Sequence, residues 1–257
     1  MSRKQLKSRL LFYLSSQGIS FTNNLSDSYD FAIYWNNNLV SIPDKKILDI
    51  SKNKKVLNIN CTNVTKKKID EIQEQVFGYK LCVDPFIYRG KGVIRNNKQA
   101  QGYRNLIKVV NFPIKVEEQK LDKYDPNYIL YQKFIDTYDK NGFRIELRVI
   151  ICIDKIPLVF YKKFDDKKKP FKHRHSQDLF IPVDPNVVFT DFELNKILEY
   201  SKKIGLDFGE IDILKKNDKI YVTDVNNLPG NGSFINSIKK DGESVVKLIG
   251  KSLILRI

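Results

Sequence analysis

Oxygen-bearing side chains recur on two apolar segments in the last quarter of the sequence. Asp212 lies within residues 205–214, and Asp224 and Asn226 lie within residues 220–227. Side chains alternate between the faces of a strand, so Asp224 and Asn226 share a face, and Asp212 joins them if the connecting loop has an odd number of residues. Carboxylates crowded into a sheet repel each other and lose hydration, so they require a compensating cation. Oxygen ligands of this kind suit Mg²⁺, with water and phosphate oxygens completing its shell.

Asp224 and Asn226 also have an ordinary structural interpretation. The segment continues into Pro229 and Gly230, and Asp and Asn often cap turns of this kind. The residues taken alone leave metal binding and turn capping equally open.

A second candidate site comes from a predicted hairpin over residues 146–163. A turn at Asp154 and Lys155 would place a set of apolar side chains on one face: Leu147, Val149, Ile151, Leu158 and Phe160. On the other face Arg148 would lie opposite Tyr161, with Lys163 as its diagonal neighbour. Two cations that share one face of a buried sheet repel each other unless an anion lies between them, so we expect an anion site rather than a solvated face.

The segment from Asp212 to Gly230 resembles the metal-binding strand pair of ATP-grasp enzymes. In that family an acid on one strand is followed, on the next, by acid-x-Asn-x-x-Pro-Gly, and here Asp224-Val225-Asn226-Asn227-Leu228-Pro229-Gly230 follows Asp212. The order of the other elements agrees from about Tyr79 onward, whereas residues 1–78 match the family only loosely. The resemblance implies that Asp212, Asp224 and Asn226 hold two Mg²⁺ ions, for which Mn²⁺ could substitute, on the phosphates of ATP.

The resemblance also implies a nucleotide site at the end of a strand. The stretch Gln132 to Ile135 is similar to the hinge whose backbone binds adenine in this family. Lys133 would offer its carbonyl to the exocyclic amine and Ile135 its amide to a ring nitrogen, while Asp136 or Asp139 would hold the ribose. An ordinary strand end remains the alternative.

Basic residues would complete the phosphate site. Lys80 lies on the expected first lid strand, and Arg95 occupies the place of a second phosphate-binding lysine, with a rigid fork instead of a compact ammonium. Arg148 and Lys163 fall where the family places groups that bind the transferred phosphate. Arg174, in a long polar stretch, would contact the triphosphate or an acidic substrate.

Hydrophobic periodicity predicts the elements that position these residues. Residues 3–17 form a helix that ends near Gly18, and another helix lies between Asn60 and Gly78. A capping box at Thr190 to Glu193 begins a helix that Gly205 ends. Short strands are predicted at residues 31–35, 56–60, 79–83, 92–95, 106–110 and 128–135.

Composition narrows the class of protein. With 257 residues, 42% of them hydrophobic, the chain can bury a substantial core. No run of apolar residues is long enough to cross a bilayer, and the apolar run near Leu10 is too short for a signal peptide, so we expect a cytoplasmic protein. The three cysteines lack metal-ligand spacing and are expected to be buried thiols. The net charge of +15 is only weak evidence for nucleic-acid binding. Lys is abundant together with Ile and Asn, and a general bias of composition would produce all three whatever the function.

We therefore expect an α+β chain with the ATP-grasp fold. A small N-terminal α/β domain would span residues 1–78, the lid subdomain residues 79–140, and the subdomain with the metal site residues 141–257. The resemblance implies an ADP-forming ligase that joins a small-molecule carboxylate, an acidic peptide or a glycan to an amine through an acyl phosphate. A small-molecule kinase on the same fold and a non-catalytic nucleotide-binding protein are the alternatives. The sequence does not indicate an oligomeric state.

Overall fold

The structure is a computed structural model that describes residues 9–24, 26–36, 38–96, 108–113, 129–165, 179–227 and 242–257. Its strands are β1 (Phe31–Ile33), β2 (Lys55–Leu57), β3 (Gly90–Asn96), β4 (Lys108–Phe112), β5 (Ile129–Lys133), β6 (Arg144–Cys152), β7 (Lys155–Phe164), β8 (Leu179–Val183), β9 (Phe208–Lys216) and β10 (Lys219–Asn226). Its helices are α1 (Arg9–Ser16), α2 (Lys45–Ser51), α3 (Lys66–Phe77), α4 (Pro185–Val188), α5 (Asp191–Ile204) and α7 (Gly242–Ile254).

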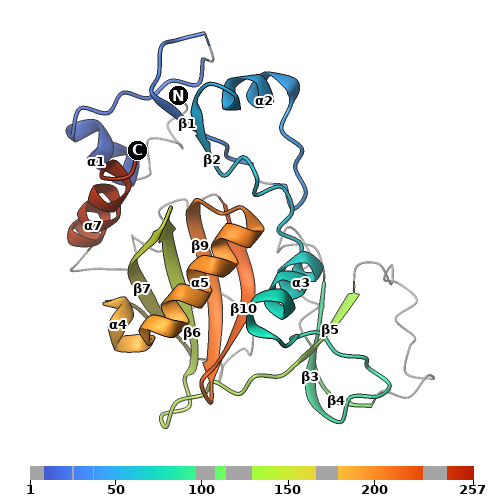
Figure 1. Ribbon diagram of the computed structural model, residues 1–257. Helices are drawn as coiled ribbons and strands as arrows, with labels where there is room; N and C mark the ends of the chain where they lie inside the picture. Colours follow the sequence, from blue (N-terminus) through green and yellow to red (C-terminus); the bar gives the residue numbers. More distant parts are fainter. Residues whose placement is uncertain are drawn as a thin grey trace.

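The described strands form three sheets (Figure 1). β1 and β2 pair in parallel near the N-terminus. A three-stranded antiparallel sheet has the order β4-β3-β5, and a five-stranded antiparallel sheet has the order β10-β9-β6-β7-β8. The chain is therefore α+β, as predicted.

Both faces of the five-stranded sheet are covered over part of their area. α5 crosses one face, with α3 beside β10, and their apolar residues share a core with the odd-numbered residues of β6 and β9 (Figure 1). α7 packs with α1 against the other face, over a core that contains Ile150, Phe160 and Phe208. Within the described part of the chain, no helix is both long and apolar enough to span a bilayer.

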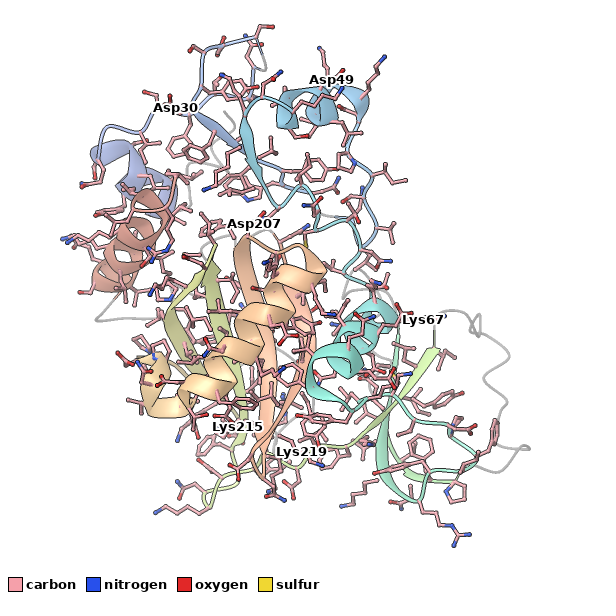
Figure 2. All side chains as sticks on the ribbon, in the orientation of Figure 1. Asp30, Asp49, Lys67, Asp207, Lys215 and Lys219 are labelled. Carbon is pink, nitrogen blue, oxygen red and sulfur yellow. The ribbon has the colours of Figure 1, made fainter. Side chains whose placement is uncertain are left out.

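Asn58 ties the N-terminal region to the five-stranded sheet. Its amide oxygen accepts from the backbone N–H groups of Asp207 and Phe208, both at 2.8 Å. Its amide nitrogen donates to the carbonyls of Phe208 at 2.7 Å and Asn227 at 3.2 Å. Asn58 has a φ of 62°, which Asn tolerates better than most residues. Figure 2 shows Asp207 at this end of the sheet.

α3 covers the edge of the sheet at β10. The buried side chain of Gln73 accepts from the Val222 N–H at 3.0 Å and donates to the Ile220 carbonyl at 2.7 Å. Gln73 thus supplies the hydrogen bonds that a neighbouring strand would otherwise make to this edge. The predicted helix boundary at Gly78 is confirmed, because Gly78 ends α3 with a φ of 80°.

The predicted capping box of α5 is also confirmed. Thr190 accepts from the Glu193 N–H, and the Glu193 carboxylate accepts from the Thr190 N–H. At the other end Gly205 adopts a φ of 79°, and a Cβ there would lie 2.4 Å from the Asn60 backbone. α5 is therefore a structural element that supports the sheet from the face opposite Asp212.

The three-stranded sheet differs from the prediction in one respect. Residues 79–83 do not form a strand, and only a single bridge joins Cys82 to Gln132 on β5. The two backbone hydrogen bonds of that bridge run from the Lys133 N–H to Leu81 at 2.9 Å and from the Val83 N–H to Tyr131 at 2.8 Å. The segment turns aside because the Asp70 carboxylate accepts the Leu81 and Cys82 N–H groups.

Candidate active site

Asp212 and Asp224 pair directly across β9 and β10. The hairpin has a two-residue turn, because Lys216 pairs with Lys219, and not the odd-numbered loop that the sequence led us to expect. A β-bulge between Val222 and Asp224 inserts Thr223 and restores the register. The two carboxylates therefore share one face of the sheet.

Arg148 and Lys162 lie on the same face and pair with Asp212. Arg148 donates to both carboxylate oxygens, from Nε at 2.8 Å and from Nη2 at 2.9 Å, and Lys162 Nζ donates to Oδ2 at 3.1 Å. Burial by itself would raise the pKa of Asp212, but the two cations outweigh it and hold the pKa well below its usual range. Asp212 is therefore an ionised carboxylate whose charge is balanced by the protein.

The position of Lys163 requires a correction. The β6–β7 turn falls at Ile153 and Asp154, one residue earlier than predicted, and β7 then carries one extra residue between Lys155 and Leu158. Arg148 consequently pairs with Phe160 instead of Tyr161. A register shift of one residue exchanges the two faces of a strand.

Lys162 therefore shares the face of Arg148, and Lys163 lies on the opposite face. Lys163 Nζ contacts Asp139 Oδ2 at 3.3 Å. The same shift moves Leu158 and Phe160 away from Leu147 and into the core that α7 covers.

Lys162 belongs to a chain of buried charges. It forms an ion pair with Glu146, its partner across β6 and β7, and Glu146 Oε2 lies 3.8 Å from Arg144 Nη1. The guanidinium of Arg144 also lies over the ring of Phe164, 4.5 Å from its centroid. Acids and bases thus alternate along β6 and across to β7 and β9, which compensates the cost of burying each charge.

Asp224 pairs with a lysine from a different element. Lys66, the first residue of α3, is buried and donates to Asp224 Oδ1 at 2.6 Å and to the Thr223 carbonyl at 2.7 Å. Burial lowers the pKa of Lys66 most, Asp224 opposes that shift, and the positive charge of Arg95 adds to it. Arg95 on β3 therefore lies within electrostatic range of Lys66.

Asn226 pairs with Glu210, one row further along the two strands. Asn226 Nδ2 lies 3.4 Å from Glu210 Oε2, and Arg148 Nη1 lies 3.1 Å from the same oxygen. Burial disfavours the charge of Arg148, but Asp212 and Glu210 outweigh it and raise the pKa of Arg148 well above its usual value. We call the set Asp212, Asp224, Asn226, Glu210, Arg148 and Lys162 the polar face.

The three predicted metal ligands fit a hard cation in part. Asp212, Asp224 and Asn226 all offer oxygen from one face of adjacent strands, which is the donor type that Mg²⁺ prefers. The side chain of Asp224 is 37% exposed and so accessible to a ligand. Within the described residues, no three His, Cys, Asp or Glu side chains are grouped so that they alone could hold a metal. The residues would thus supply part of a coordination sphere, with the remainder from water and phosphate.

The expected adenine hinge lies at the end of β5, an edge strand of the three-stranded sheet, which we call the small sheet. Gln132 is buried and pairs with Val93, and Lys133 pairs with Gly92. Ile135 lies just beyond the end of β5 and is partly buried. Asp136 is exposed, and its carboxylate accepts from the Tyr138 N–H at 3.2 Å.

Asp139, the other ribose candidate, has a structural role in the turn that follows. Its carboxylate accepts from the N–H groups of Asn141 and Phe143, at 2.9 and 3.0 Å. These backbone bonds and Lys163 outweigh the opposing effect of desolvation and lower the pKa of Asp139. Asp136 is thus the more accessible of the two carboxylates.

Lys80, which we expected at the phosphate site, has another contact. It is exposed and pairs with Glu74 on α3 at 2.9 Å. Gly92 on β3 allows close packing in the small sheet, because a Cβ there would lie 1.8 Å from the ring of Phe112. Arg174 lies outside the described residues.

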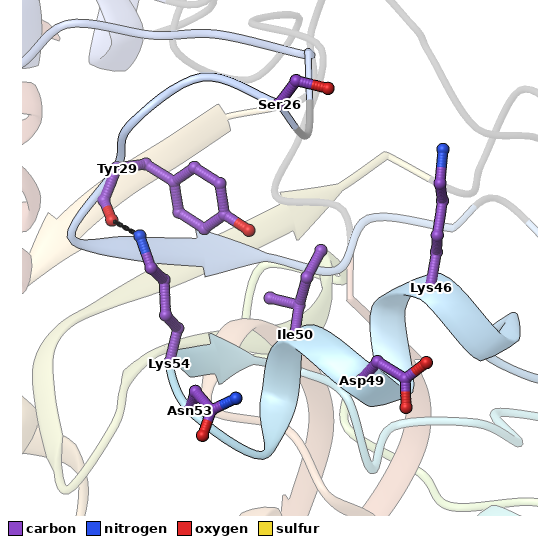
Figure 3. A pocket seen from close by; sticks show the side chains of 7 residues that line it. All are labelled: Ser26, Tyr29, Lys46, Asp49, Ile50, Asn53 and Lys54. Carbon is purple, nitrogen blue, oxygen red and sulfur yellow. Dashed lines mark hydrogen bonds between the residues drawn. The ribbon is translucent and has the colours of Figure 1, made fainter.

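A separate open cavity of about 410 Å³ lies in the N-terminal region (Figure 3). Its lining residues are Ser26, Tyr29, Lys46, Asp49, Ile50, Asn53 and Lys54. Lys54 donates to the Tyr29 carbonyl and lies 4.0 Å from the centroid of the Tyr29 ring. No residue of the polar face lines this cavity.

The sequence analysis missed Lys66, Lys162 and Glu210. The position of Glu210 two residues before Asp212 was a usable signal, because the two must share a face of β9. The correct register of β6 and β7 would have identified Lys162. Nothing in the local sequence indicates that Lys66 reaches the edge of β10, since that contact joins residues 158 positions apart.

Comparison with known proteins supports the fold. No family model matches the chain, and no curated protein does. D-alanine–D-alanine ligase from Bacillus anthracis complexed with ATP aligns with 99% of this chain and 94% of its own, at a TM-score of 0.58 and 13% identity. The ATP-grasp ligase PsnB complexed with minimal precursor, Mg and ADP aligns with 79% of this chain at a TM-score of 0.53 and 14% identity. The aligned region spans 63% of the length of PsnB. The chain has the ATP-grasp fold.

Proposed function

We propose that the protein is an ADP-forming ligase that uses ATP to join a carboxylate to an amine. The observation that carries the proposal is the pairing of Asp212 with Asp224 on one face of an ATP-grasp sheet, with Arg148 and Lys162 beside them. In this reaction the substrate carboxylate attacks the γ-phosphorus of ATP, ADP leaves, and an amine then displaces phosphate from the acyl phosphate. The main chemical demand is to stabilise negative charge on the transferred group.

The side chains of the polar face meet that demand. Arg148 uses three of its five N–H groups on Asp212 and Glu210, which leaves two for an oxygen of the transferred phosphate. Lys162 adds a buried positive charge on the same face. These groups are held in place before the substrate arrives, so they need little reorganisation during the reaction.

Asp212, Asp224 and Asn226 would hold Mg²⁺, which neutralises phosphate charge when it is bound. The premise that these carboxylates lack any other compensation was wrong, because Arg148, Lys162 and Lys66 already pair with them. Asp212 accepts three hydrogen bonds, and a carboxylate has about four acceptor positions, so one remains for a cation.

Lys66 and Arg95 provide a second group of cations at the edge of β10. Lys66 lies beside the partly exposed carboxylate of Asp224, and the positive charge of Arg95 on the small sheet acts on Lys66. An anionic triphosphate between the two sheets would relieve the repulsion between Lys66 and Arg95. In this proposal the backbone near Lys133 and Ile135 binds adenine, and Asp136 binds the ribose.

The chemistry and the structural matches support a substrate class. The matched PsnB structures contain a minimal precursor or a precursor peptide, and the Bacillus enzyme is a D-alanine–D-alanine ligase. We therefore propose amino acids and peptides as the first carboxylates to test, with acidic sugars as a further class. The excess of basic residues in the chain is compatible with acidic substrates.

Hydroxylamine capture tests the reaction class. The protein is incubated with ATP, Mg²⁺ and pools of carboxylates, without an amine, and a ligase should produce ADP, phosphate and a hydroxamate together. Asp224→Asn should abolish all three products, whereas Glu199→Gln, an exposed acid on α5, should leave them unchanged. A phosphorylated alcohol without hydroxamate from any pool would show a kinase instead. ATP binding without turnover would indicate a nucleotide-binding protein.

A further inference from the structure

Glu210 is a buried carboxylate that the proposed reaction does not itself require. It lies on β9 two residues before Asp212, on the same face, and only 1% of it is exposed. It pairs with Ile150 on β6 and with Asn226 on β10. Ile150 belongs to the apolar core under α7, so Glu210 marks the boundary between that core and the polar face.

The contacts of Glu210 connect two functional side chains. Its Oε2 lies 3.1 Å from Arg148 Nη1 and 3.4 Å from Asn226 Nδ2. Arg148 also donates to Asp212 from Nε and Nη2, so the guanidinium contacts two carboxylates. A carboxylate buried at this depth persists only where donors surround it.

We propose that Glu210 is a positioning residue that fixes the orientation of Asn226, an inference that rests on the proposed metal site. Asn226 turns its NH₂ group toward Glu210, whose carboxylate oxygen accepts from it. The amide is planar, so its oxygen points away from Glu210, and a cation on the polar face would bind that oxygen. With a neutral residue at position 210, the amide could turn over and present NH₂, which cannot bind a cation.

Measurements of Mn²⁺ affinity test this role independently of turnover. Mn²⁺ is titrated into the protein with a non-hydrolysable ATP analogue, and binding is followed by electron paramagnetic resonance. Glu210→Gln should weaken Mn²⁺ binding about 10- to 100-fold, as loss of an outer-shell partner commonly does. Glu193→Gln is the matched control, because Glu193 is also buried and paired, with Lys215 at 2.7 Å, but on the opposite face. It should leave Mn²⁺ affinity unchanged.

A second substitution separates orientation from general damage. Asn226→Asp places oxygen at both positions of the side chain, so its orientation no longer matters for a cation. In that background Glu210→Gln should change Mn²⁺ affinity by less than about 3-fold, whereas damage to the structure would persist in both backgrounds. An equal loss in the two backgrounds, or no loss in either, would overturn the inference. If Glu210→Gln does not fold, the Asp and Asn variants of Glu210 repeat the comparison with a shorter side chain.

The same titration distinguishes failure of this inference from failure of the proposed function. If Asp224→Asn abolishes Mn²⁺ binding and Glu210→Gln does not affect it, only the positioning role is wrong. If the unmodified protein with the ATP analogue does not bind Mn²⁺, the metal site and the proposed ligase chemistry fail together.

Discussion

Asp212 and Asp224 face each other across β9 and β10 although a two-residue turn joins their strands. The turn uses Asn217 and Asp218 with φ values of 48° and 58°, which suits a tight hairpin. By itself this turn would place the two acids on opposite faces. Thr223 bulges out of the ladder and donates from its hydroxyl to the Asp212 carbonyl at 3.2 Å, and the bulge brings the acids together.

Asp224→Asn should destabilise the protein in the absence of metal. The substitution leaves the buried Lys66 without a charged partner, and partial exposure of Asp224 limits the cost to about 1 to 2 kcal/mol. Carboxylates that only repelled each other would give the opposite result, with the stability unchanged or raised. Urea unfolding of Lys66→Met, Asp224→Asn and the double variant measures it. A coupling energy near zero would show that the pair contributes nothing.

Lys162 and Lys163 should differ sharply in their effect on ATP turnover. Lys162→Met removes a cation from the polar face and should lower the rate of ADP release about 100-fold, as loss of a transition-state donor does. Lys163→Met should change the rate by less than about 3-fold, because its partner is Asp139 on the other face. Both variants need melting curves, since Lys162 is buried. Equal losses of activity would contradict the register in the structure.

Acid should remove the stability that Asp212 contributes. Its pKa is depressed from the ordinary value of 3.8, so the contribution is fully present above about pH 5 and falls as the pH drops below 3.8. The free energy of unfolding should favour the unmodified protein over Asp212→Asn by about 2 kcal/mol at pH 7, and the gap should shrink toward pH 2. Urea titrations at several pH values test this. A difference in unfolding free energy that does not change with pH would mean that the partners of Asp212 do not lower its pKa.

Gln73 should stabilise the edge of β10 that α3 covers. Gln73→Leu removes the partner of the Val222 N–H and one of two donors to the Ile220 carbonyl, which also accepts from the Tyr79 hydroxyl at 3.0 Å, so we expect a cost of about 1 to 3 kcal/mol. Gln73→Glu keeps the acceptor for Val222 but replaces the donor to Ile220 with an acceptor and buries a charge, so its cost should be at least as large. Denaturant unfolding compares the variants. A Leu variant as stable as the original would show that water replaces the side chain.

Local sequence was sufficient to predict the existence of most elements. The capping box at Thr190, the glycine stop at Gly205 and the apolar stripe of α3 depend on contacts within a few residues, so their patterns are visible in one dimension. The Asp212 to Asn226 pattern also led to the ATP-grasp fold, through its resemblance to the metal-binding strand pair of that family.

Only the tertiary structure decided which side chains meet on the polar face. A one-residue difference in a turn or a bulge exchanges the faces of a strand. Lys162, and not Lys163, therefore lies on the polar face, and the bulge at Thr223 lets Asp224 pair with Asp212. Lys66 reaches Asp224 from a helix 158 residues earlier, and no local pattern encodes that contact. The charge balance of the site therefore depends on strand register and long-range packing, which the sequence by itself does not display.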